Sequence, residues 1–319
     1  MRIGQNPAKS IDFVPQPERV TVAIVTYIPT LGGYYAQSLD VLKACLGSIW
    51  KNTHTPYDLM VFDNGSCEQV RNYLTGAQEQ GRIQYLMLSE KNVGKAGAWN
   101  IIFAAAPGEY VAYADSDVYH YPGWLAPQLE LFETFPNLGM VTGMPMWTPE
   151  EFSSSTIEWA QKNPEVGLER GRFLSWEDYW RHSQSLGAEE EKARAHYNAN
   201  ETICVFHAGK QYYVGAAHFQ FVASKKVLQS VLPIPSRRPM GEVRLLDIAL
   251  NERGYLRLTT PDWWVQHIGN TLGDEFKPRG TESTTRKFKS PRGGIWKSKP
   301  VQKIARWLYH LTFEILYKD

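Results

Sequence analysis

Short apolar runs alternate with amphipathic stretches through the first half of the chain. The runs VTVAIVTY, YDLMVFD, RIQYLML and YVAYAD have the length and the β-branched content of strands buried on both faces. Between them, apolar residues recur at helical spacing from about Ser38 to the KNTHTP segment, and again in CEQVRNYLTGAQEQG and GKAGAWNIIFAAAPG. This alternation predicts parallel βαβ units, and hence an α/β fold whose mostly parallel central sheet is flanked by helices.

The pattern changes after about Pro145. Residues 148–212 are polar, aromatic and irregular, with one charged helical stretch, GAEEEKARAHYNAN, and we expect an insertion or lid here, not a separate domain. The core then resumes with the strand-like YYVGAAHFQFVASKKVL, the helix GEVRLLDIALNERGY and the apolar TTPDWWVQHIGN. The sequence thus divides into a leader (1–17), a first half (18–145), a second half that carries the insertion (146–270) and a tail (271–319).

Charge and cysteine content narrow the class of protein. The formal net charge of +1 gives no whole-chain case for binding nucleic acid. From Thr271 onward there are 11 Lys and Arg against 5 Asp and Glu, so a basic tail follows a mildly acidic body. Three cysteines without a CxxC pair argue against a disulfide framework or a zinc site and favour a reducing compartment. No signal-like segment and no long apolar run is present, which predicts a cytoplasmic protein.

Polar residues end the predicted parallel strands. They are Thr26 in the first strand, Asp63 and Asn64 in the second, and Asp115 and Asp117 in the fourth. Ligands of open α/β sheets bind just beyond the carboxyl ends of the strands. We therefore expect these side chains to line one rim.

Asp115 and Asp117 are two residues apart in an extended segment, so both carboxylates can point to one place. Such oxygen ligands suit Mg²⁺ or Mn²⁺ held together with the phosphates of a substrate, and Ser116 between them can face a sugar. The alternative is that the pair caps the next turn. The other polar strand ends favour the metal site.

Three further features could complete this site. Asp63 can accept a hydrogen bond from a nucleobase imide, or instead form an Asx turn with Asn64. NVGKAGAWN opens a helix with two glycines, so its backbone N–H groups and Lys95 can approach a diphosphate, unless the glycines serve only close packing. His267, in WWVQHIGN, can complete the metal site as a neutral imidazole, or be a core histidine.

Taken in order, these segments resemble inverting nucleotide-sugar glycosyltransferases of the GT-A fold, glycosyltransferase family 2. The matching pieces cover roughly residues 18–270 and are VTVAIVTY, LKACLGSIWKNT, VFDNGS, NVGKAGAWN, YADSDVYHYPGWL, GEVRLLDIALNERGY and VQHIGN. The resemblance implies transfer of a sugar from a UDP-, dTDP- or GDP-linked donor to a saccharide or lipid-linked glycan in polysaccharide biosynthesis, with Mn²⁺ or Mg²⁺ as cofactor.

The resemblance also implies roles for single residues. The nucleoside would be held by Thr26, Tyr27 and Asp63, with Asn64 in the same turn. The family's N-x-G motif with its distal Asn falls on Asn92, Gly94 and Asn100, which would lie along the diphosphate side. The metal ion would be bound by Asp115 and Asp117, with His267 joining the ion or the diphosphate.

The catalytic base of this family usually comes from a Glu-Asp pair that opens a late helix, and this chain departs from that pattern. Glu242 is followed by Val243, so Glu242 or Asp247 must serve instead. Five residues apart on a helix they point about 140° from each other. We favour Glu242, which would take the proton of the acceptor hydroxyl as it attacks the anomeric carbon.

The remaining features leave alternatives open. Aromatic residues of the insertion suit stacking on sugars or packing in a core. The amphipathic pattern after Val301, preceded by a basic stretch, suits either peripheral binding to the inner face of a membrane or docking on the protein itself. QKIARW has one residue too many for the QxxRW motif of processive synthases, so we expect a non-processive hexosyltransferase. A nucleotidyltransferase and a non-catalytic nucleotide- or sugar-binding module are the rival functions.

Overall fold

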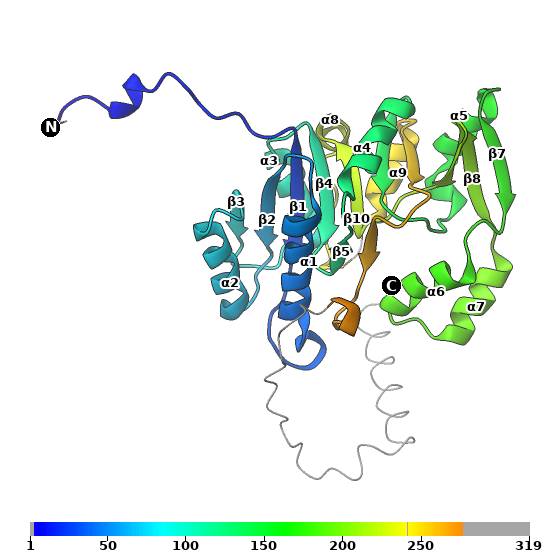
Figure 1. Ribbon diagram of the computed structural model, residues 1–319, viewed down its shortest axis with the longest axis horizontal. Helices are drawn as coiled ribbons and strands as arrows, with labels where there is room; N and C mark the ends of the chain where they lie inside the picture. The colour runs from blue at the N-terminus through cyan, green and yellow to red at the C-terminus, as the bar shows by residue number, and fades with distance from the viewer. Residues whose placement is uncertain (1–2, 241, 277–319) are drawn as a thin grey trace, which may run out of the picture. The chain divides into compact units, whose positions relative to one another are not determined.

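The computed structural model describes residues 3–240 and 242–276, and within them a ten-stranded sheet has the order β3-β2-β1-β4-β10-β6-β11-β9-β8-β7 (Figure 1). Its strands are β1 (Val20–Thr26), β2 (Asp58–Asp63), β3 (Tyr85–Leu88), β4 (Tyr110–Asp115), β6 (Leu138–Thr142), β7 (Gly167–Gly171), β8 (Thr202–His207), β9 (Lys210–Val214), β10 (Gln220–Ser224) and β11 (Leu256–Thr259). A separate two-stranded sheet pairs β5 (Val118–His120) with β12 (Val265–His267).

Helices cover both faces of the large sheet. The α-helices are α1 (Ser38–Asn52), α2 (Glu68–Glu79), α3 (Gly94–Ala105), α4 (Leu125–Thr134), α5 (Ser154–Lys162), α6 (Trp176–Ser185), α7 (Glu190–Ala199), α8 (Lys225–Ser230) and α9 (Arg244–Glu252). Short 3₁₀ helices are η1 (Pro7–Ser10), η2 (Gly33–Tyr35), η3 (Glu150–Phe152) and η4 (Asp274–Phe276). Helices α1, α2 and α4 bury their apolar side chains against one face, and α3, α8 and α9 against the other.

Strand direction divides the sheet. Strands β3, β2, β1 and β4 are parallel, as the alternating pattern predicts, and β6 is parallel to β11. Strand β10 runs antiparallel to both β4 and β6, and β7, β8 and β9 form an antiparallel edge. The predicted α/β fold with a helix-flanked central sheet is confirmed, and the parallel strands are those that supply the predicted rim.

The prediction of an irregular insertion was wrong in part. Residues 148–212 contain three helices, α5, α6 and α7, and their strands β7, β8 and β9 lengthen the main sheet instead of forming a detached lid. The polar and aromatic composition hid these strands because β7 is an edge strand with mostly exposed side chains. The segment after Tyr212 also differs from the single predicted strand, because residues 215–219 separate β9 from β10.

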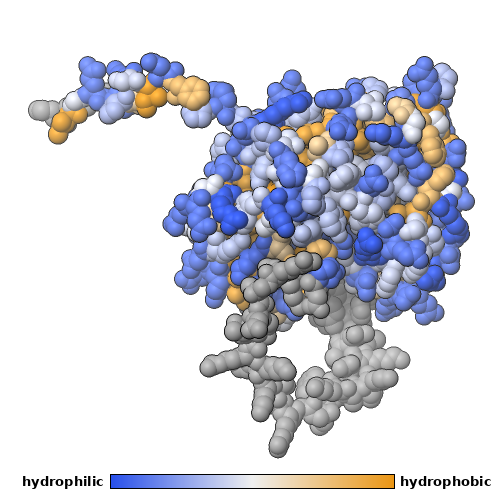
Figure 2. Space-filling view, in the orientation of Figure 1, coloured by the Kyte–Doolittle hydropathy of each residue, from blue (hydrophilic) through white to orange (hydrophobic). Residues whose placement is uncertain are grey.

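Most of the face seen in Figure 2 is hydrophilic, with apolar side chains scattered over it. In the described part of the chain, no helix has the length and apolar content required to cross a bilayer. The basic stretch and the amphipathic pattern after Val301 lie outside the described residues.

Candidate active site

Strand register brings the predicted polar strand ends together. Thr26 of β1 pairs with Asp63 of β2, and Val25 pairs with Asp115 of β4, so these three parallel strands end side by side. His267 enters from the separate small sheet, where it pairs with Val118, the residue that follows Asp117. The rim that the sequence predicts is therefore present, and its histidine is delivered by β12 pairing with β5.

Asp115 is held by two neighbours. Lys95 Nζ, from the first turn of α3, lies 2.6 Å from Asp115 Oδ2, and the Tyr113 hydroxyl donates to Asp115 Oδ1 at 2.5 Å. Burial raises the pKa of the Asp115 carboxyl, and the Lys95 ammonium opposes that rise. Lys95 thus supplies positive charge at the point where the sequence predicts a diphosphate.

Asp117 and His267 form the other half of the rim. His267 Nε2 lies 3.2 Å from Asp117 Oδ2, while His267 Nδ1 is 2.9 Å from Ser185 Oγ of α6. Burial acts to raise the pKa of Asp117, but the charge and hydrogen bonding of His267 outweigh it and leave that pKa lowered. Burial likewise acts to lower the pKa of His267, and the Asp117 carboxylate outweighs it in the opposite direction.

Asp117 and His267 are side chains of the kind that bind a divalent cation. Asp117 Oδ1 is buried and has no hydrogen-bond partner in the described part of the chain, which leaves a carboxylate oxygen available as a ligand. Ser185 fixes the imidazole ring of His267 through Nδ1 and leaves Nε2 on the Asp117 side. Within residues 3–240 and 242–276, no group of three or more His, Cys, Asp or Glu converges as a metal site. An ion here therefore needs ligands from a substrate besides Asp117 and His267.

At the end of β2 the Asp63 side chain bonds to the backbone three residues further on, which ties it into the turn after the strand. The Asp63 carboxylate is buried and accepts from the backbone N–H of Ser66, with Arg71 Nε 3.5 Å away. Burial raises the pKa of Asp63, against the hydrogen bonds of Ser66 and the charge of Arg71. At the neighbouring end of β1, Thr26 Oγ1 is buried without a hydrogen-bond partner among the described residues, and the Tyr27 ring is 37% exposed.

The asparagines of the predicted site hold backbone segments in place. Asn64 Oδ1 accepts from Val93 N at 2.8 Å, and Asn92 Oδ1 accepts from Gly94 N at 2.8 Å, which together fix the start of α3. Asn100 exchanges two hydrogen bonds of 2.7 Å with the backbone of Ile234. The amides of Asn64 and Asn100 thus bond to the fold itself, and their contact with a ligand stays a prediction.

Gly94 offers a direct test of this support. Its φ is +76°, and a Cβ there would lie 2.8 Å from the Arg238 carbonyl oxygen, in the segment that packs over the start of α3. We expect Gly94→Ala to lower the free energy of unfolding by about 1–3 kcal/mol, because backbone strain and a backbone clash add. Gly76→Ala is the control, since a Cβ in that part of α2 meets no atom within 4 Å. Equal urea midpoints for the two variants would contradict the expectation.

The two candidate bases differ sharply in their surroundings. Glu242 precedes α9 in a left-handed conformation, φ +59°, and its carboxylate accepts from Arg237 N at 2.6 Å. Asp247 is 2% exposed and lies between Arg257 Nη2 and His218 Nε2, each 2.5 Å from one of its oxygens. The burial of Asp247 favours a supporting role over direct contact with an acceptor, and the identity of the base stays a prediction.

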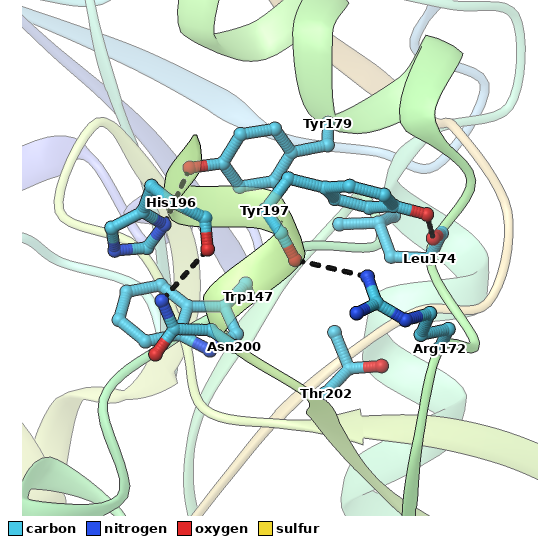
Figure 3. Close-up of a pocket in the computed structure, with 8 residues that line it drawn as sticks. All are labelled: Trp147, Arg172, Leu174, Tyr179, His196, Tyr197, Asn200 and Thr202. Carbon is cyan, nitrogen blue, oxygen red and sulfur yellow. Dashed lines mark hydrogen bonds between the residues drawn. The ribbon is translucent and has the colours of Figure 1, made fainter. Parts of the chain in front are cut away.

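The aromatic residues of the insertion pack mainly against one another. Trp176 stacks on Trp180 with ring centroids 5.7 Å apart. The Tyr179 hydroxyl lies 2.8 Å from His196 Nδ1, as Figure 3 shows. The pocket that Tyr179, His196 and Tyr197 help to line holds about 10 Å³, roughly room for one water and not for a sugar. Beside it, an open polar groove is lined by Trp147, Thr148, Pro149, Glu150, Glu151, Arg170, Arg172, Asn198, Ala199, Asn200 and Glu201.

Three residues of the site escaped prediction from the sequence. Tyr113 is two residues before Asp115 and points to the same side, which the alternation of a strand implies. His218 precedes an antiparallel strand, and the start of such a strand lies at the same rim as the carboxyl ends of its parallel neighbours. Arg257 in β11 has no signal in the sequence, because only folding places it beside α9.

Comparison with known proteins agrees with this geometry. Residues 28–182 match a family described as glycosyl transferase family 2. These residues belong to glycosyltransferase family 2. The matched segment contains the strand ends Asp63, Asp115 and Asp117, and it stops short of His218, Asp247 and His267.

Curated relatives match over shorter segments. An uncharacterised glycosyltransferase of Nostoc sp. (strain PCC 7120) is 33% identical over 100 residues, which are 31% of this chain and 31% of that protein. The chondroitin synthase of Escherichia coli is 25% identical over 133 residues, 42% of this chain and 19% of that enzyme. The chain thus matches less than a third of the length of either relative.

Two solved structures illustrate the likeness to known backbones. A mannosyltransferase from Pyrobaculum calidifontis, in complex with GDP-Man and Mn²⁺, is 15% identical with a TM-score of 0.46, over 79% of this chain and 58% of that one. Residues 1–349 of TarS from S. aureus, in complex with UDP-GlcNAc, are 13% identical with a TM-score of 0.46, over 81% of this chain and 60% of that one.

Proposed function

We propose that this glycosyltransferase moves one hexose from a UDP-, dTDP- or GDP-linked donor to a hydroxyl of a saccharide or lipid-linked glycan, with inversion at the anomeric carbon. The observation that carries the proposal is the rim itself, where a lysine-held Asp115 stands beside Asp117 with a free carboxylate oxygen and His267. Membership of residues 28–182 in family 2 supports the same reaction class.

Each residue of the rim has a proposed role that follows from its position. The exposed ring of Tyr27 at the end of β1 can stack on a nucleobase, and the unpartnered Thr26 Oγ1 can bond the nucleoside. The Lys95 ammonium, which contacts Asp115, would bind the diphosphate, whereas the backbone N–H groups of Val93, Gly94 and Lys95 are bonded within the protein. Asp117 and His267, with Asp115, would hold Mn²⁺ or Mg²⁺, and such an ion neutralises the charge that develops on the departing diphosphate.

Binding and turnover measurements test this function. Calorimetry with UDP, dTDP and GDP, each with and without Mn²⁺ or Mg²⁺, should show one diphosphate that binds only with metal. The corresponding nucleotide sugars, incubated with free sugars or with water as acceptor, should then release that same diphosphate. The proposal fails when none of the three diphosphates binds in a metal-dependent way. Metal-dependent binding without turnover of any donor would indicate a nucleotide-binding module.

A further inference from the structure

His218, Asp247 and Arg257 form a buried charged cluster that the metal and diphosphate roles do not use. We propose that His218 is the general base that deprotonates the acceptor hydroxyl, and that Asp247 is its positioning residue. This proposal rests on the transfer reaction proposed above and names the residue that completes it.

The cluster is held from its buried end. Arg257 Nη2 lies 2.5 Å from Asp247 Oδ1 and also donates to the carbonyl oxygen of Ala216 at 2.8 Å, while Arg257 Nη1 donates to that of Phe152 at 2.6 Å. The other carboxylate oxygen, Oδ2, is 2.5 Å from His218 Nε2. The guanidinium therefore holds the Asp247 carboxylate in place. That carboxylate lies against His218 Nε2, which is buried and has no hydrogen-bond partner among the described residues.

The solvent exposure of the side chains increases along the cluster from Arg257 to His218. The side chains of Arg257 and Asp247 are 1% and 3% exposed, whereas that of His218 is 22% exposed. Nε2 of His218 faces the carboxylate, and Nδ1 makes no hydrogen bond to any described residue. A histidine with one nitrogen turned to a carboxylate and the other open is arranged to accept a proton on the open nitrogen.

The imidazole lies at the same rim as the metal half of the site. The residue after His218 is Phe219, whose carbonyl oxygen accepts from Asp115 N at 2.7 Å. The His218 ring centroid is 6.1 Å from that of Trp99, and Lys95 Nζ is 5.3 Å from the same Trp99 ring while it contacts Asp115. A single indole ring thus separates the proposed base from the diphosphate side.

The two acids named from the sequence are worse placed for proton transfer. Asp247 is buried, and the Glu242 carboxylate is engaged by Arg237 N. Val243 stands where the family has its second acid, and Asp247 follows it by four residues. A helix places both positions on one face, with the carboxylate of Asp247 one turn further along the helix. His218 lies between this buried carboxylate and the rim.

The proposed reaction is a single displacement with His218 as the proton acceptor. The acceptor O–H bond breaks as its proton moves to His218 Nδ1, and the oxygen forms a bond to the anomeric carbon. The bond from that carbon to the phosphate oxygen breaks, and its electron pair leaves with the nucleoside diphosphate. The imidazolium that forms is stabilised by Asp247 and returns its proton to water.

The test compares His218→Gln, His218→Ala and Glu242→Gln with the wild type, using the donor found by the screen above, Mn²⁺, and water or free sugars as acceptors. His218→Gln should release the diphosphate at least about 100-fold more slowly, with metal-dependent binding of the diphosphate within about twofold of wild type. Added imidazole should restore part of the turnover of His218→Ala, because it replaces the missing base. The exposed control His54→Gln should stay within about threefold of the wild type. A 100-fold loss in Glu242→Gln with normal turnover of His218→Gln would return the role of the base to Glu242.

A second comparison tests Asp247. Asp247→Asn should lower kcat with little change in KM for the donor, and the double variant with His218→Gln should be no slower than His218→Gln alone, because both changes disable one unit. Additive losses would reduce Asp247 to a structural role. Retention of wild-type turnover by His218→Gln would overturn the assignment of the base while leaving the glycosyltransferase function in place. Absence of wild-type turnover and metal-dependent binding would instead overturn the function.

Discussion

Turnover of the donor is expected to fall by about 1,000-fold when Asp117 is replaced by asparagine, equivalent to about 4 kcal/mol of lost transition-state stabilisation. Asparagine keeps the size of the side chain, so the fold should persist. It removes the negative charge that faces His267 at 3.2 Å, and with it the free carboxylate oxygen that we expect to bind the cation. The departing diphosphate then loses the charge that neutralises it.

Two measurements check the Asp117 variant. Release of nucleoside diphosphate gives the rate, and calorimetry should show that the dependence of diphosphate binding on Mn²⁺ is lost together with it. Asp262→Asn is the matched control, since Asp262 is exposed and stands just before β12. Turnover above a tenth of wild type in Asp117→Asn, with Mn²⁺ dependence unchanged, would show that this carboxylate does not bind the ion.

Replacing Arg257 with methionine is expected to lower the free energy of unfolding by about 3–5 kcal/mol. Arg257 is 1% exposed and contacts Asp247 at 2.5 Å, so its loss leaves a carboxylate buried without its strongest partner. Burial lowers the pKa of Arg257, and the charge and hydrogen bonding of Asp247 oppose that effect. Two backbone carbonyls, of Phe152 and Ala216, also lose their donor.

An exposed arginine provides the comparison for this prediction. Arg170 Nη2 lies 2.8 Å from Glu150 Oε2, but the two side chains are 45% and 55% exposed, so Arg170→Met should change stability by no more than about 1 kcal/mol. Urea unfolding of both variants gives the difference. The double variant Arg257→Met with Asp247→Leu should recover part of the loss, because it removes the unpaired charge. Equal midpoints for Arg257→Met and Arg170→Met would show that the buried pair adds no stability.

Local patterns in the sequence were sufficient to predict the first half of the fold. The alternation of apolar strands and amphipathic helices predicts β1, β2, β3, β4 and the helices between them. Strands β1, β2 and β4 are largely buried, whereas β3 is an edge strand with exposed and half-buried side chains. The same patterns place Asp63, Asp115 and Asp117 at strand ends, and parallel strands necessarily end at one rim. Strand β7 was missed because its side chains are exposed or half-buried, and the short apolar run of β8 stands alone between polar segments.

The sequence by itself determined the chemistry at the strand ends, since residue type and strand period are local properties. Only the tertiary structure decided which residues share that chemistry. Lys95 reaches Asp115 because α3 packs beside β4, and His267 reaches Asp117 because β12 pairs with β5. Asp247 changes from a candidate base to the partner of Arg257 and His218, residues 10 and 29 positions away in the chain. Burial and pairing between distant segments are properties of the packed molecule, which no spacing along the chain encodes.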